Sequence, residues 1–183
     1  MSTLQLFCDR PSEARTARED AAYDFLEKLN IPFRRVDHAP AMTMEDCVAI
    51  DEALGVSMCK NLFLCNRQKT EFYLLLMPAS KPFRTKELSA QLETARLSFG
   101  SAEDMERLLG VSPGAVTVMG LINDKERLVR LLIDKDLLAD AEIGCHPLVN
   151  TSSVAFSMQA LLQTLLPATG HAPTTVTLLG MDM

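Results

Sequence analysis

A lysine and an asparagine stand side by side in an apolar segment that has the pattern of a strand. Residues 58–65 read Met-Cys-Lys-Asn-Leu-Phe-Leu-Cys. Because side chains alternate along a strand, Lys60 and Asn61 are expected on opposite faces. A lysine at the end of an apolar face is partly dehydrated, which makes its ammonium a strong anchor for a phosphate or a polarised carbonyl. The alternative is that Lys60 only extends into water from the strand end.

A second segment, residues 144–153, concentrates polar side chains around a proline. It reads Gly-Cys-His-Pro-Leu-Val-Asn-Thr-Ser-Ser. Polar groups on a loop held by a scaffold are a common form of binding site, but local turn bonds and a helix cap would use the same residue types. Gly114, in the Pro113-Gly114 turn, is a third candidate, because glycine lets a ligand approach the backbone or serves a turn that needs positive φ.

Several kinds of chemistry lack their sequence signature. The chain has no GxGxxG, no Walker lysine motif, no HExxH and no GxSxG, and it shows no evident Ser–His–Asp or Cys–His nucleophile. The three histidines are His38, His146 and His171. Because Cys145 and His146 have no second ligand pair at a useful spacing, neither a metal nor a cofactor is expected.

Helices and strands alternate along the chain without regular βαβ units. The 3.6-residue period and capping signals predict helices over residues 12–29, from Thr43 to Gly55, after Thr85, over 101–110 and over 157–166. Alternation and apolar runs predict strands over residues 33–37, 59–65, 72–77, 115–119, 127–133 and 154–156. The pattern predicts one α/β domain over residues 1–183 with a mixed sheet flanked by helices, ending in a weakly structured tail over residues 170–183.

Composition limits the classes of function. The chain has 183 residues, with 24 acidic and 18 basic ones, and a formal net charge of −6. This balance excludes a sequence-blind nucleic-acid coat, and DNA is not an expected partner. The five cysteines form no CxxC pair, which favours reduced thiols in a cytoplasmic protein. The apolar runs are too short to cross a bilayer, so no membrane association is expected.

The order and spacing of several segments resemble the YbaK/ProX family of aminoacyl-tRNA deacylases, which is related to the editing insertion of bacterial prolyl-tRNA synthetases. The similarity covers about residues 26–166. It is carried by His38-Ala39-Pro40 with Thr43, residues 60–64, Ser112-Pro113-Gly114-Ala115-Val116-Thr117, Ile122-Asn123-Asp124, and residues 144–157. The resemblance implies one compact α/β domain with a curved mixed sheet, and its closest branch is ProX.

The resemblance also implies roles for individual residues. The essential lysine of the family falls on Lys60, a substrate-site residue on Asn61, the pocket glycine on Gly114 and the histidine that shapes the aminoacyl pocket on His146. Further substrate-binding candidates in matching segments are Asn150, Thr151, Ser153, His38 and Thr43.

The implied function is trans-editing: hydrolysis of mischarged tRNA, Ala-tRNA(Pro) first, with help from a hydroxyl of the terminal ribose. The family pattern continues with proline after Thr117, whereas this chain has Val118-Met119-Gly120. Deacylation of another substrate such as Cys-tRNA(Pro) therefore stays open, as does a non-catalytic module that binds aminoacyl-tRNA. The expected partners are the acceptor end of a mischarged tRNA and, as a further candidate, prolyl-tRNA synthetase.

The charge is unevenly distributed along the chain. Between Lys60 and Lys86 there are six basic residues and one acidic residue, whereas the rest of the chain is strongly acidic. A local basic strip beside Lys60 suits the 3′ end of a tRNA, and the acidic remainder discourages extended binding. Arg67, Lys69 and Arg84 are therefore candidate tRNA contacts, although a solvated hairpin loop and an ordinary helix start would also place charges there.

Overall fold

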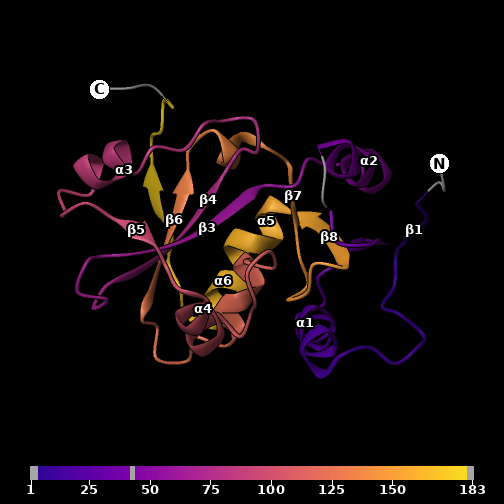
Figure 1. Ribbon diagram of the computed structural model, residues 1–183. Helices are drawn as coiled ribbons and strands as arrows, with labels where there is room; N and C mark the ends of the chain where they lie inside the picture. Colours follow the sequence, from indigo (N-terminus) through magenta and orange to yellow (C-terminus); the bar gives the residue numbers. More distant parts are fainter. Residues whose placement is uncertain (1–3, 42–43, 181–183) are drawn as a thin grey trace.

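The structure, a computed structural model, describes residues 4–41 and 44–180. Its strands form two sheets that lie side by side, with helices around them (Figure 1). The helices are α1 (Ala17–Lys28), α2 (Met44–Leu54), α3 (Thr85–Gln91), α4 (Ala102–Leu109), α5 (Met158–Ala160) and α6 (Leu166–Thr169). The strands are β1 (Leu6–Phe7), β2 (Arg34–Asp37), β3 (Lys60–Cys65), β4 (Phe72–Met77), β5 (Ser98–Phe99), β6 (Val129–Asp134), β7 (Glu142–Cys145), β8 (Ser152–Ser157) and β9 (Thr174–Val176).

The first sheet has the strand order β1-β2-β8-β7 and is antiparallel throughout. The second has the order β5-β3-β4-β6-β9 and is mixed, because β4, β6 and β9 run parallel while β3 pairs antiparallel with β4 and β5. The expectation of an α/β fold with a mixed sheet is confirmed, with the strands divided between two sheets. A parallel bridge between Met58 and Gly144 joins the two sheets just before β3.

The hairpin of β3 and β4 is the hairpin that the sequence predicts. The side chain of Asn66 closes its loop, since Oδ1 of Asn66 accepts hydrogen bonds from the backbone N–H groups of Thr70 and Glu71 at 2.9 and 3.1 Å. All six residues of β4 are buried, as expected for a central strand with both faces covered. The hairpin therefore fixes the direction of Lys60 and Asn61 at the other end of β3.

The core has two main parts, one on each face of the second sheet. The larger lies between the sheet, α1, α4 and the helix that begins at Met158, and it contains Phe63 of β3. The smaller lies under α3 and contains Leu64 of β3 together with Leu88. The alternation expected for β3 is thus observed, and it sends Asn61 and Lys60 to different faces.

Three details differ from the sequence-based expectations. The first helix begins at Ala17 because Thr16, rather than Ser12, caps it through the N–H of Glu19. Residues 115–119 do not form a strand, because the Thr117 side chain caps a 3-10 helix, Val118–Ile122. Within the expected tail, Thr174–Val176 form β9, which pairs with β6, and Val176 and Leu178 are buried.

The helix predicted after Ser157 contains an irregular turn. Ser157 caps α5 through the N–H of Ala160, as expected, but residues Leu161–Leu165 form a π-helical turn before α6. Pro167 lies in the first turn of α6. Since proline has no N–H and its ring crowds the carbonyl four residues earlier, a wider turn before it avoids a broken hydrogen-bond ladder.

Candidate active site

A cavity of about 280 Å³ lies where the two sheets meet. It draws side chains from both sheets, from α2 and from the turn at Gly114. Its lining residues are Ala41, Cys47, Ile50, Met58, Cys59, Asn61, Gly114, Val116, His146 and Ser153. The cavity therefore brings together four of the residues chosen from the sequence, namely Asn61, Gly114, His146 and Ser153.

Asn61, one of the lining residues, has an unsatisfied acceptor. Its Nδ2 donates to the carbonyl oxygen of Cys59 at 3.1 Å and lies 3.3 Å from the Cys59 Sγ atom. Its Oδ1 is buried and has no hydrogen-bond partner among the described residues. Because leaving a buried polar atom unpaired is costly, this oxygen is suited to receive a donor from a ligand.

Cys59 is a poor nucleophile in this position. Burial raises the pKa of its thiol to about 12, so the thiol stays protonated at neutral pH. Burial also raises the pKa of Cys145. A mechanism through a thiolate at either cysteine is therefore disfavoured.

His146 is held in one orientation by backbone atoms. Its Nδ1 lies 2.9 Å from the carbonyl oxygen of Ser152, and its own carbonyl oxygen accepts a 2.7 Å hydrogen bond from the Thr117 hydroxyl. Burial lowers the pKa of His146, and the nearby His38 lowers it further. The ring is therefore neutral at pH 7, with the proton on Nδ1 and a lone pair on Nε2.

Ser153 and His38 form a second pair beside His146. The His38 Nε2 lies 2.8 Å from the Ser153 Oγ, and the His38 Nδ1 lies 2.8 Å from the carbonyl oxygen of Ala39. The rings of His38 and His146 are 6.2 Å apart between centroids. If the carbonyl of Ala39 fixes the proton on Nδ1, then Nε2 accepts from the serine hydroxyl, whose oxygen keeps its lone pairs for a ligand.

Gly114 and Asn150 form the rim on the loop side. Gly114 has φ of 88°, a conformation that side-chain-bearing residues rarely adopt. A Cβ atom there would lie 3.5 Å from the Asn150 Nδ2. The carbonyl oxygen of Thr151 accepts a 3.0 Å hydrogen bond from the His38 N–H, so Thr151 contributes through its backbone. Thr43 lies outside the described residues.

Lys60 does not line the cavity in this structure. Its Nζ donates a 2.6 Å hydrogen bond to the carbonyl oxygen of Lys81, on the face opposite to Asn61. The Lys81 ammonium is itself neutralised by Asp134 at 2.6 Å and Asp136 at 2.7 Å. Lys60 therefore lies next to the cavity along the chain, with an ammonium that has two further hydrogens to donate.

The predicted basic strip is split by the fold. Arg67 and Lys69 lie in the β3–β4 loop, at the end of the hairpin away from Lys60, and β3 alone spans roughly 17 Å. The Lys69 ammonium lies 3.6 Å from the Asp104 carboxylate. Arg84 lies at the N-cap position of α3. The structure does not gather these three cations at the cavity, and their contact with tRNA stays a prediction.

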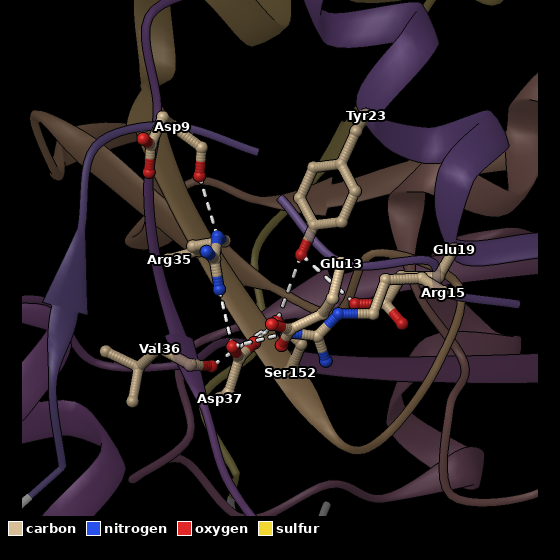
Figure 2. Close-up of polar contacts among 9 residues, drawn as sticks. All are labelled: Asp9, Glu13, Arg15, Glu19, Tyr23, Arg35, Val36, Asp37 and Ser152. Carbon is tan, nitrogen blue, oxygen red and sulfur yellow. Dashed lines mark hydrogen bonds and ion pairs between the residues drawn. The ribbon is translucent and has the colours of Figure 1, made fainter. Parts of the chain in front are cut away.

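The polar network behind the cavity was not evident from the sequence. Figure 2 shows Ser152 at its centre: the Ser152 Oγ lies 3.1 Å from the hydroxyl of Tyr23, on α1, and 3.1 Å from the Asp37 Oδ1, on β2. Arg35 and Arg15 donate to the other Asp37 oxygen. Because β8 begins at Ser152, the network fixes the strand that carries Ser153 and supplies the carbonyl that holds His146.

The ionisation of this network follows from its contacts. Burial alone would raise the pKa of Asp37, but the hydrogen bonds and charges of Arg35 and Arg15 outweigh burial and lower it. Glu19, which accepts from the Tyr23 hydroxyl at 3.3 Å, has its pKa raised by burial. Protonation of Asp37 therefore opposes folding, whereas protonation of Glu19 favours it.

Residues of α2 and of the segment after it form the apolar wall that the sequence analysis did not assign. Cys47 and Ile50, three positions apart on α2, face the cavity with Met58. A spacing of three residues marks one side of a helix, but that signal alone does not separate a cavity wall from a core contact.

The motif Ile122-Asn123-Asp124 supports the fold rather than the cavity. Asn123 donates from Nδ2 to the carbonyl oxygen of Leu109 at 2.9 Å and packs against Gly110, the left-handed C-cap of α4. Asp124 is buried and pairs with His171 at 2.9 Å. The residues therefore position α4 and the chain before β9.

A neutral histidine, a hydroxyl and an unpaired amide oxygen around a small apolar cavity define a site for a small polar ligand with an apolar part. Residues 38–164 match the aminoacyl-tRNA editing domain family, and the chain belongs to this family. Membership implies aminoacyl-tRNA deacylase activity.

Two curated relatives and one solved structure are similar to the chain. The prolyl-tRNA editing protein ProX of Acetoanaerobium sticklandii is 28% identical over 146 residues, which is 80% of this chain and 88% of that protein. The prolyl-tRNA synthetase associated domain-containing protein 1 of Danio rerio is 30% identical over 152 residues, 82% of either chain. A crystal structure described as a candidate trans-editing enzyme for prolyl tRNA synthetase has a TM-score of 0.66 at 15% identity, covering 90% of this chain and 99% of that one.

In the described part of the chain, no helix is both long and apolar enough to cross a membrane.

Proposed function

We propose that the protein is a trans-editing hydrolase that deacylates tRNA mischarged for proline, with Ala-tRNA(Pro) as the preferred substrate. The observation that carries the proposal is the buried Oδ1 of Asn61, a lining residue of the 280 Å³ cavity, which has no hydrogen-bond partner among the described residues. The free α-ammonium of an aminoacyl ester is a donor that such an oxygen would accept. The names of the relatives support the choice of proline tRNA.

The chemistry asks little of the protein, because an aminoacyl-tRNA is an activated ester. A water oxygen bonds to the carbonyl carbon, the ester bond to the ribose oxygen breaks, and the water proton ends on that ribose oxygen. The neighbouring ribose hydroxyl helps to activate the water in this proposal. The protein places the ester and stabilises the negative oxygen, which suits a site without an activated nucleophile.

Each residue then has a distinct task. His146 and Ser153 orient the ester through Nε2 and Oγ, and backbone groups near Gly114 face the carbonyl oxygen. Lys60 holds the terminal ribose–phosphate, exchanging its hydrogen bond to the Lys81 carbonyl for one to the substrate. Asn150 and His38 support the rim and the serine, respectively.

The apolar wall would supply the selection. A synthetase pocket built for proline discriminates weakly against alanine, because each missing methylene group is worth only about 1–3 kcal/mol. Ile50, Met58 and Val116 limit the width of the cavity. A site that admits alanine and excludes the proline ring would hydrolyse the wrong ester and spare the right one.

The test is a deacylation panel with proline tRNA that carries alanine, cysteine, serine or proline. The proposal expects the alanyl ester to be hydrolysed fastest and the prolyl ester to be spared. Faster hydrolysis of the cysteinyl ester would move the assignment to Cys-tRNA(Pro). Binding of these esters without single-turnover hydrolysis would instead make the protein a non-catalytic module. Addition of prolyl-tRNA synthetase to the same assay tests it as a partner.

A further inference from the structure

One aromatic ring lies exposed on the surface of the second sheet. The chain has eight phenylalanines, two tyrosines and no tryptophan, all phenylalanines and tyrosines within the described residues. Phe99 is 59% exposed, whereas every other ring is buried or half-buried. Burying such a ring would contribute about 1.5–3 kcal/mol, and its exposed face is available for stacking with a ligand.

Phe99 lies on the same face of the sheet as Lys60. In the pairing of β5 with β3, Phe99 is opposite Leu64, and Lys60 shares the Leu64 face by alternation. Four residues along β3 separate the two positions, or roughly 13 Å. The half-buried Phe83 packs over the same face, with its ring centroid 6.0 Å from that of Phe99 in an edge-on arrangement.

The surroundings of the two rings are mainly basic. Arg84 follows Phe83 directly, and Lys86 and Arg96 line a cavity of about 440 Å³ between α3 and the segment before β5. Of the acidic residues nearby, Glu87 is buried and accepts hydrogen bonds from the N–H groups of Leu179 and Gly180, and Glu93 is exposed. Among these named residues the three cations outnumber the two carboxyl groups, which favours a polyanionic ligand.

We propose that an aromatic–basic face, formed by Phe83, Arg84, Lys86, Arg96 and Phe99, binds the unpaired nucleotides that precede the terminal adenosine of a tRNA. The proposal rests on the proposed function, which places the aminoacyl end in the cavity. From there the RNA passes Lys60, its bases stack on Phe99 and Phe83, and its phosphates meet the three cations. Stacking on aromatic rings together with basic side chains is how proteins hold single-stranded RNA.

RNA fits this face better than a protein partner does. The face begins at Lys60, which is next to Asn61 along β3 but on the other side of the sheet from the cavity, and its charge opposes the net charge of −6 of the whole chain. A localised basic area on an acidic protein favours end-directed binding over coating of a long RNA.

The experiment uses fluorescence anisotropy to measure binding of the full-length protein to an RNA hairpin that carries no amino acid and has a single-stranded 3′ ACCA end. A blunt hairpin of the same stem is the comparison. Phe99→Ala is expected to raise the Kd for the ACCA hairpin at least about fivefold, and Phe99→Trp is expected to retain binding. Neither change is expected to alter the Kd for the blunt hairpin. Leu6→Ala, at a 43% exposed residue of the other sheet, is the matched control and is expected to bind as the wild type does.

The charges are tested by salt dependence. Lys86→Glu with Arg96→Glu is expected to reduce the slope of log K against log salt by about 1.4, since each phosphate contact on a single strand contributes about 0.7. Lys28→Glu on α1, also at an exposed position, is expected to leave the slope unchanged. Circular dichroism checks that each variant is folded.

Wild-type affinity of folded Phe99→Ala for the ACCA hairpin would overturn the proposal. If that variant also lost association with prolyl-tRNA synthetase, the face would instead be a protein-docking surface. Because the hairpin carries no amino acid, this binding test is independent of the proposed function. If the protein bound RNA through Phe99 but hydrolysed no aminoacyl ester, the proposed function would be refuted and the proposed RNA-binding face would stand.

Discussion

The Nδ1 atom of His146 lies 2.9 Å from the carbonyl oxygen of Ser152, and the Ser152 side chain is bonded on its other side to Tyr23 and Asp37. One residue thus connects the cavity with the polar network behind it. A carbonyl can only accept, so Nδ1 carries the proton and the lone pair of Nε2 is left for the ligand.

His146 should give the reaction a pH dependence that lies on the acid side. Because burial lowers the pKa of His146 below its usual 6.5, the neutral form is expected to persist below pH 6.5, and kcat/KM for alanyl ester should fall only at lower pH. His146→Gln should remove this inflection and change the preference among alanyl, cysteinyl and seryl esters. An unchanged inflection and preference profile would exclude His146 from both roles.

Lys60 should affect hydrolysis more than folding. Lys60→Ala is expected to lower the rate of Ala-tRNA(Pro) hydrolysis by about 10²-fold or more, because loss of the contact to the terminal ribose–phosphate would misplace the ester. The melting temperature should change little, because the side chain makes one hydrogen bond at a strand end. Lys28→Ala on α1 serves as the control, and wild-type activity of Lys60→Ala would contradict the assignment.

Thiol reagents should inhibit the protein through Cys47. Cys47 and Cys59 both line the cavity, but Cys47 is exposed whereas Cys59 is buried with a pKa of about 12. Alkylation with N-ethylmaleimide is therefore expected to place a bulky group at the cavity through Cys47 and block hydrolysis. Cys47→Ser should resist inactivation, and Cys8→Ser, at another exposed cysteine, should stay sensitive. Inactivation of Cys47→Ser at the wild-type rate would refute this prediction.

Asp37 and Glu19 should change acid stability with opposite signs. The lowered pKa of Asp37 means that its stabilisation is complete above the unfolded pKa near 3.9 and is lost as pH falls through the folded pKa. Below about pH 4, the free energy of unfolding should therefore decrease less steeply with falling pH in Asp37→Asn than in the wild type. The raised pKa of Glu19 means that its ionisation opposes folding. Glu19→Gln should therefore raise the free energy of unfolding, and most at neutral pH, where the glutamate is ionised. Urea unfolding at several pH values measures both, and equal behaviour of the two variants would contradict the assigned ionisation.

Local signals made much of the fold predictable. The apolar runs of β3 and β4, the polar loop between them and the capping residues Ser101 and Ser157 each specify their element within a few neighbouring residues. The short strands β1, β5 and β9 have no such signal, because two or three residues acquire extended structure only by pairing with a partner strand. The strand predicted over residues 115–119 does not form, because the Thr117 hydroxyl accepts a hydrogen bond from the Met119 N–H and caps a 3-10 helix. That bond depends on the local turn.

Residues of the candidate site were predictable where a local pattern and the family pattern both mark them. Asn61, Gly114, His146 and Ser153 lie in matching segments, and the fold gathers them from distant parts of the chain. The supporting residues Tyr23 and Asp37 lie among other polar residues of α1 and β2 and carry no distinguishing sequence signal. Only the tertiary packing of α1 against β2 and β8 brings them into one network.

The bridge between Met58 and Gly144 makes the width of the cavity a property of how the two sheets meet. Asn61 enters from one sheet, while His146 directly follows β7 of the other. A Cβ atom on Gly144 would lie 3.1 Å from the Met58 Sδ and 3.3 Å from the Ser57 carbonyl oxygen. Gly144→Ala should therefore push the sheets apart by a few tenths of an ångström, and the editing panel should show some hydrolysis of the prolyl ester. In the proposed function, the range of accepted esters would therefore depend on the junction of the two sheets as well as on the residues that contact the ester.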